Sequence, residues 1–143
     1  MRTFFVLFLL AFTAHAFSQN VSTKNRGQIT ELLTQQEKCW NKGNIDGYMA
    51  YYWNSDSLKF VTKNGITRGW SKTLENYKQH YPDKASMGTL VFEEIVLEKM
   101  NRKTIFVIGK WTLNRISDSI GGRFSLICKK ISGTWKIVID HTS

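Results

Sequence analysis

A carboxyl group and an imidazole stand next to each other near the end of the chain, in the stretch GTWKIVIDHTS at residues 133–143. Asp140 and His141 have side chains that abstract protons when an apolar pocket shields them from water. Because side chains alternate between the two faces of a strand, His141 shares a face with Trp135 and Ile137, and Asp140 points the opposite way. We therefore expect only one of the two to face a pocket, unless a bulge intervenes, and we expect it to be His141.

Other residues could take part in the same chemistry. Asp46 and Glu94 are further candidate bases, and a developing oxyanion needs hydrogen-bond donors. Candidate donors are Tyr48, Tyr51, Tyr52 and Arg115. A structural interpretation stays open beside this one, in which His141 only hydrogen-bonds to a neighbouring element, the aromatic residues fill the core and Asp46 caps a helix.

The sequence lacks the motifs of several large enzyme classes. It contains no G-x-S-x-G, no H-E-x-x-H, no phosphate-binding loop and no dinucleotide glycine fingerprint. After the first 16 residues only His80 and His141 remain, so one chain cannot build a three-histidine metal site. We expect no metal and no cofactor. Cys39 and Cys128 are interpreted as core thiols, with a disulfide between them as the alternative.

The first 16 residues indicate export. Arg2 precedes the apolar run Phe4–Phe12, and Ala14-His15-Ala16 follows it, which is the pattern of a secretory signal peptide cleaved after Ala16. The run is too short to span a bilayer, which takes about 20 apolar residues. We expect a periplasmic or secreted protein that leaves the membrane after cleavage.

The charge of the chain does not point to a nucleic acid. The formal net charge is +9, but lysine and arginine are scattered along the sequence. A nucleic-acid-binding surface gathers such residues into a stripe or patch, and none occurs here. We interpret the positive charge as a solvated basic surface.

Hydrophobic periodicity places helices early in the chain and strands late. Apolar residues recur every three or four positions in the predicted helices and at every second position in the predicted strands. Asn64-Gly65 is a hairpin turn, Pro82 ends a helix and residues 117–122 are expected to form a loop. The order α-α-β-β-α-β-β-β-β indicates an α+β domain. The predicted helices are 27–42, 46–53 and 71–81, and the predicted strands are 58–62, 66–68, 89–100, 104–115, 124–131 and 134–141.

Four stretches carry a resemblance to a known family: CWNKGNIDGYMAYY, FVTKNGITRGW, IFVIGKWTL and GTWKIVIDHTS. Their order and spacing resemble the nuclear transport factor 2-like superfamily, also called SnoaL-like or ketosteroid-isomerase-like, and within it the exported bacterial members of unassigned function. The resemblance covers residues 27–143, with 17–26 as a flexible leader. It implies a cone, in which a strongly curved mixed sheet packs on a long N-terminal helix, and a homodimer formed through the convex face of the sheet.

The resemblance also implies a pocket inside the cone, but no particular reaction, because this fold carries many functions. Three functions stay open: a small-ligand-binding or accessory domain; an isomerase, cyclase or dehydratase using His141 or Asp140 as general base; and a dimeric protein-interaction module. We expect the pocket to be lined by Trp40, Tyr48, Tyr52, Trp53, Phe60, Trp111, Arg115 and Trp135.

Overall fold

The computed structural model describes residues 20–143, and the expected signal peptide lies outside the described residues. Helices come first and most strands later, as the periodicity predicts. The helices are α1 (Thr23–Asn41), α2 (Ile45–Met49), α3 (Trp70–His80) and the single turn α4 (Lys84–Met87). The strands are β1 (Lys59–Thr62), β2 (Gly65–Arg68), β3 (Thr89–Asn101), β4 (Thr104–Asn114), β5 (Ser119–Ile131) and β6 (Thr134–Thr142).

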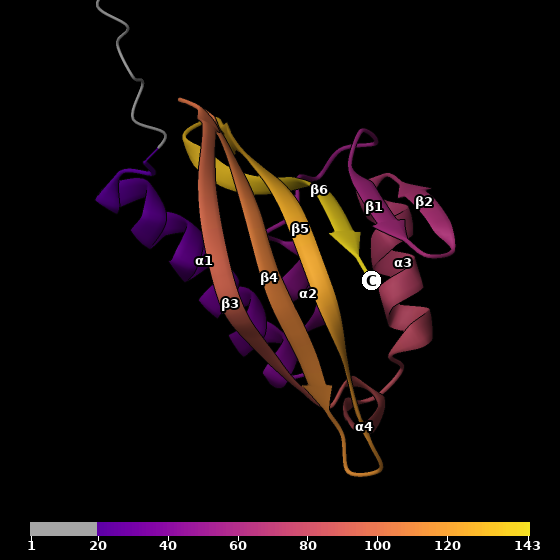
Figure 1. Cartoon of the computed structure of the whole chain (residues 1–143). Helices are drawn as coiled ribbons and strands as arrows, with labels where there is room; N and C mark the ends of the chain where they lie inside the picture. Colours follow the sequence, from indigo (N-terminus) through magenta and orange to yellow (C-terminus); the bar gives the residue numbers. More distant parts are fainter. Residues whose placement is uncertain (1–19) are drawn as a thin grey trace, which may run out of the picture.

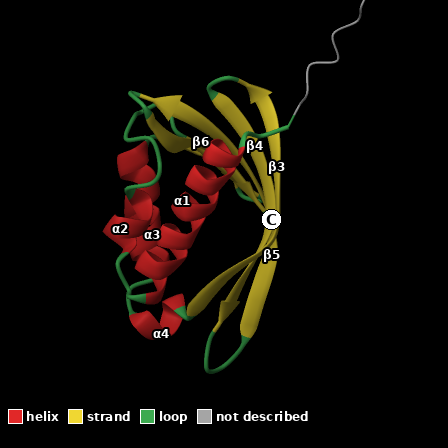
Figure 2. Cartoon of the chain, turned by 90° about the vertical axis from the view of Figure 1, so that its left-hand side faces the viewer, coloured by secondary structure: helices red, strands yellow, loops and turns green. Residues whose placement is uncertain are grey.

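The strands form one six-stranded sheet in the order β2-β1-β6-β5-β4-β3. Neighbouring strands are antiparallel except β1 and β6, which run parallel, so the sheet is mixed. Figure 2 shows that the sheet is strongly curved and that the helices lie on its concave side, with α1 crossing that side. The expected α+β cone is thereby confirmed (Figure 1).

Two local expectations are wrong. Residues 119–122 continue β5 and do not form a loop, because they pair with the far end of β4, from Asn114 opposite Ser119 to Trp111 opposite Gly122. The N-cap of α2 is Asn44, whose side chain accepts a hydrogen bond from the Gly47 amide, and not Asp46. The turn α4 was not expected, since four residues carry too little periodicity to reveal it.

Three β-bulges bend the sheet, and one of them lies at the end of β3, where Met100 is the extra residue between the pairs Lys99–Ile105 and Asn101–Thr104. On β3 an extra residue lies between the pairs Glu93–Lys110 and Val96–Ile108, and Glu94 there has a φ of 54°. On β6 the extra residue is Val138. A bulge kinks its strand and increases the local twist, which helps a sheet to curl into a cone.

The core lies between α1 and the concave face of the sheet. The buried stripe of α1 contains Ile29, Leu32, Leu33, Gln36 and Trp40. Asn41 ties the end of this helix to β3, because its side-chain amide donates to the Leu90 carbonyl at 2.9 Å and accepts from the Leu90 amide at 2.7 Å. These two hydrogen bonds fix the position of the C-terminal end of α1 relative to β3.

Cys39 and Cys128 are both free thiols. Cys128 is fully buried, which raises the pKa of its thiol to about 12 and keeps it protonated at neutral pH. Among residues 20–143 no helix combines the length and the hydrophobicity that crossing a membrane requires.

Candidate functional site

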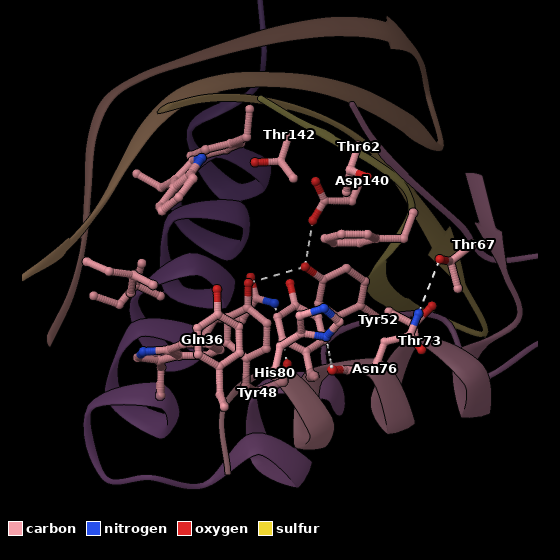
Figure 3. A pocket seen from close by; sticks show the side chains of 18 of the residues that line it. Gln36, Tyr48, Tyr52, Thr62, Thr67, Thr73, Asn76, His80, Asp140 and Thr142 are labelled. Atoms are coloured by element: carbon pink, nitrogen blue, oxygen red, sulfur yellow. Dashed lines mark hydrogen bonds between the residues drawn. The ribbon is translucent and has the colours of Figure 1, made fainter. Parts of the chain in front are cut away.

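A cavity of about 570 Å³ lies between the concave face of the sheet and the helices (Figure 3). Its walls come from α1, α2, α3, the hairpin of β1 and β2, and the strands β3 to β6. Nine of its lining residues are aromatic, and they give the interior a largely apolar surface: Trp40, Tyr48, Tyr52, Phe60, Tyr77, Tyr81, Phe92, Trp111 and Phe124.

Asp140 is the carboxyl group of this cavity. Its side chain is only 5% exposed, and it is the one buried acidic residue in the described part of the chain. Phe60 lies opposite it on β1 and Leu126 opposite it on β5. Oδ2 accepts a hydrogen bond of 2.6 Å from the Tyr52 hydroxyl, whereas Oδ1 has no partner among the described residues (Figure 3).

Three tyrosines surround this carboxyl group. The hydroxyl of Tyr48 lies 3.3 Å from that of Tyr52, so a short hydrogen-bonded chain ends on Asp140. Burial and the nearby carboxylate raise the pKa of Tyr48, Tyr52 and Tyr77 above the ordinary value. All three hydroxyls therefore stay protonated at neutral pH, and each can donate a hydrogen bond.

Burial raises the pKa of Asp140 from 3.8 to about 7, and the hydrogen bond from Tyr52 opposes part of this shift. No lysine, arginine or histidine forms an ion pair with it within the described residues. The carboxyl group can thus gain or lose a proton near neutral pH, which suits both acid–base chemistry and recognition of a polar ligand group.

The bulge on β6 overturns the expected orientation of the two neighbouring residues. Ile137 pairs with Cys128 and Ile139 with Ile127, so β6 advances by two residues where β5 advances by one. Beyond Val138 the alternation is shifted by one position, and Asp140 continues the inward face of Ile137. His141 is exposed and lies outside the cavity lining.

The other expected lining residues divide into two groups. Trp40, Tyr48, Tyr52, Phe60 and Trp111 line the cavity, and the Trp111 indole nitrogen is buried without a hydrogen-bond partner among the described residues. The residues that do not line it are Trp53, Arg115 and Trp135.

Each of these three has a different environment. Trp53 is half-buried and its backbone amide donates to the Ile137 carbonyl. Arg115 forms a bidentate pair with Asp118 at 2.6 and 2.7 Å. Trp135 lies near the start of β6, before the bulge and away from Asp140. Its indole N–H donates to the Gln28 side chain in the N-terminal part of α1.

The remaining candidates for acid–base roles are engaged on the surface. Asp46 pairs with Lys78 at 2.8 Å, and Glu94 pairs with Arg123. Tyr51 is half-buried and does not line the cavity.

Tyr77 and Tyr81 line the cavity and were not among the expected lining residues. Both lie on the face of the predicted third helix that also carries Trp70 and Leu74, so the helical spacing of these apolar residues was the available signal. Phe92 and Phe124 were missed as well, since strand alternation alone does not say which face of the sheet is concave. Within residues 20–143 no group of three or more histidine, cysteine or acidic side chains is placed to hold a metal ion.

A six-stranded cone with helices on its concave side and an aromatic cavity defines a class of proteins, the nuclear transport factor 2-like fold. The chain is 38% identical to a solved nuclear transport factor 2-like protein of unknown function from Shewanella oneidensis MR-1, with a TM-score of 0.80. The match covers 82% of this chain and 98% of that one. The protein therefore belongs to the nuclear transport factor 2-like superfamily, as its sequence motifs suggested.

More distant structures share the fold. A nuclear transport factor 2-like protein of unknown function from Pseudomonas putida KT2440 is 16% identical, with a TM-score of 0.70 over 87% of this chain and 89% of that one. A cystatin-like-fold protein of unknown function from Nostoc punctiforme PCC 73102 is 13% identical, with a TM-score of 0.69 over 86% and 92%. No family model and no curated protein matches the chain.

Proposed function

We propose that the protein binds a small, largely apolar molecule inside the cone, with Asp140 and Tyr52 contacting its polar group. The cavity carries this proposal, because its volume of about 570 Å³ falls within the range of about 300–1,000 Å³ that ligand sites occupy. Its lining also has the composition of such sites, in which aromatic walls supply contact area and a few polar groups set orientation.

The polar groups of the cavity support binding over a purely structural role. A buried polar group without a hydrogen bond costs about 1–3 kcal/mol, and Oδ1 of Asp140 and the Trp111 indole nitrogen both lack a partner in the described chain. A ligand that supplies these partners offsets this cost. A cone that served only as a scaffold would gain stability from apolar residues at both positions.

A substitution that fills part of the cavity with a larger side chain tests the proposal. Thr142 is half-buried and lines the cavity, so Thr142→Trp will fill part of it. We expect the neutral apolar dye N-phenyl-1-naphthylamine to bind the unmodified protein with one site per chain and enhanced fluorescence, and Thr142→Trp to weaken binding at least tenfold. Thr134→Trp is the matched control, because Thr134 is exposed at the opposite end of the same strand, and its dye affinity will equal that of the unmodified protein. Equal dye affinity in Thr142→Trp and the unmodified protein would contradict the proposal.

Proton transfer is the second candidate function, and the pKa of Asp140 near 7 favours it. In this alternative the carboxylate takes a proton from a carbon next to a carbonyl group, and a tyrosine hydroxyl stabilises the enolate oxygen that forms. The proton then returns from Asp140 to carbon, so no other reactant is consumed.

Deuterium exchange tests this second candidate. We expect the protein to accelerate exchange of the C–H bonds of phenylacetone in D₂O above the rate in buffer, with a loss of about 10²–10⁴-fold in Asp140→Asn, the range of a general base. His141→Ala is the neighbouring control and will keep the rate, since His141 is exposed outside the cavity. Equal rates in Asp140→Asn and the unmodified protein would exclude Asp140 as the base. NMR spectroscopy measures the exchange directly.

Two further features stay proposals. Residues 1–16 support export to the periplasm or beyond. A homodimer through the convex face is supported by the resemblance and by the exposed apolar residues Val96 and Met100 on the edge strand β3.

A further inference from the structure

The cavity holds a buried carboxyl group that lacks the partner its charge requires. Oδ2 of Asp140 accepts one hydrogen bond, from Tyr52, and Oδ1 accepts none within the described residues. Buried carboxylates in proteins are normally paired with a cation, because an isolated ion in an apolar environment is costly. Asp140 has no such pair in the described chain, whereas Asp46, Glu75, Glu93, Glu94 and Asp118 all do.

The surroundings of this carboxyl group are suited to a cation. Phe60 lies opposite Asp140 on the neighbouring strand, and Tyr77 packs against Phe60 with ring centroids 5.6 Å apart. Tyr48 and Tyr52 approach from α2 and its end. Aromatic rings carry negative potential on their faces and attract ammonium groups, the more so when water is excluded.

The remaining ionisable residues of the lining limit the number of positive charges that a ligand can carry. Lys63 and His80 are both exposed, and Nδ1 of His80 lies 2.7 Å from the backbone carbonyl of Asn76 in its own helix. Neither forms an ion pair with Asp140. The lysine disfavours a second cationic group on the ligand, so one positive charge is the expected number.

We propose that the ligand is a monoamine, a single protonated primary or secondary amine on an apolar or aromatic body, with its ammonium group bonded to Oδ1 of Asp140. This inference rests on the proposed ligand-binding function and adds the chemical class of the ligand. A hydroxyl group could also donate to Oδ1, but it would leave the negative charge of the carboxylate uncompensated. An ammonium group donates the same hydrogen bond and neutralises the charge, so it binds more tightly.

Three compounds of similar shape and different charge test the inference: 2-phenylethylamine, 2-phenylethanol and 3-phenylpropanoate. Isothermal titration calorimetry at neutral pH measures each against the unmodified protein. We expect the amine to bind at least tenfold more tightly than the alcohol, and the carboxylate to bind more weakly than both. Asp140→Asn removes the charge with almost no change of shape, so it will abolish the preference for the amine and retain the alcohol. His141→Ala, which alters an exposed neighbour, will keep the preference.

The possible outcomes distinguish the monoamine inference from the proposed ligand-binding function. An alcohol or carboxylate that binds the unmodified protein as tightly as the amine overturns the inference, and so does an amine preference that survives in Asp140→Asn. If the amine does not bind but the neutral dye does, the monoamine inference is wrong and the binding function stands. If the dye fails as well, both proposals fail.

Discussion

Asp140→Asn will make the protein more stable than the unmodified chain above about pH 7, by an amount that builds up between about pH 4 and pH 7 and then stays constant. Folding raises the pKa of Asp140 from 3.8 to about 7, so between these values the folded state holds a proton that the unfolded state has lost. Stability linked to this group is fully present below about pH 4 and is lost as the pH rises through 7. One pKa unit corresponds to about 1.4 kcal/mol, so the complete effect is about 4 kcal/mol.

Urea denaturation from pH 4 to pH 9 checks this result. We expect the difference in unfolding free energy between Asp140→Asn and the unmodified protein to increase by about 1.4 kcal/mol per pH unit and to level off above pH 7 to 8. The difference isolates Asp140, because the remaining titrating groups are common to both proteins. His141→Ala is the control for a neighbouring exposed group and will not show this increase. A difference that does not change with pH would mean that Asp140 titrates normally in the folded state.

The ionisation of Asp140 also couples stability to ligand binding. Above pH 7 the folded protein carries an unpaired buried charge. A ligand that binds only the folded state raises its stability by an amount that grows with the logarithm of the ratio of ligand concentration to Kd. A ligand that pairs with Asp140 should therefore stabilise the unmodified protein most strongly where the carboxyl group is ionised.

Trp40→Ala will destabilise the protein by about 3–5 kcal/mol, the usual loss when a large buried aromatic side chain is removed. Trp40 is 2% exposed, and its ring packs edge-to-face against Tyr48, Tyr77 and Tyr81 at centroid distances of 5.2, 5.8 and 4.8 Å. Its indole nitrogen donates to the Met87 carbonyl at 3.0 Å. One side chain thus joins α1 to α2, α3 and α4 at the wall of the cavity.

Chemical denaturation of three variants measures this contribution. Trp40→Phe retains a ring but loses the hydrogen bond to Met87, so its loss should lie between those of the unmodified protein and Trp40→Ala. Ile116→Ala is the matched control, because Ile116 is fully exposed in the loop between β4 and β5 and should change stability by less than about 0.5 kcal/mol. If Trp40→Ala costs less than about 1 kcal/mol, the aromatic cluster does not hold the helices together.

Much of the fold was predictable because its signals are local. The apolar stripe of α1, the β1–β2 hairpin turn and the alternation in β4 each depend on residues a few positions apart. The turn itself is Lys63-Asn64, one residue before the predicted Asn64-Gly65, because Gly65 already pairs with Thr62. Such patterns place helices and strands, and their order was sufficient for the fold class. The elements hardest to predict were the shortest, such as α4, and the ends of strands whose pairing partner lies elsewhere in the sequence, such as the start of β5.

The residue types of the site were also visible in the sequence. Asp140 and His141 were both candidates for the pocket, and the sequence itself indicated that they point in opposite directions. Five of the eight expected lining residues do line the cavity: Trp40, Tyr48, Tyr52, Phe60 and Trp111. Arg115 does not, because its charge is paired with Asp118 across a tight turn, a contact that no periodicity predicts.

The sequence by itself determined that one of two neighbouring residues faces the cone, and only the tertiary structure decided that it is Asp140. The reason is the bulge at Val138, which shifts the alternation of β6 by one position. A bulge depends on how two strands pair over their whole length, and the run Ile137-Val138-Ile139 is apolar in any register. The raised pKa of Asp140 follows from the same arrangement, since its carboxyl group is buried among residues far away in the chain, such as its hydrogen-bond partner Tyr52, 88 positions earlier.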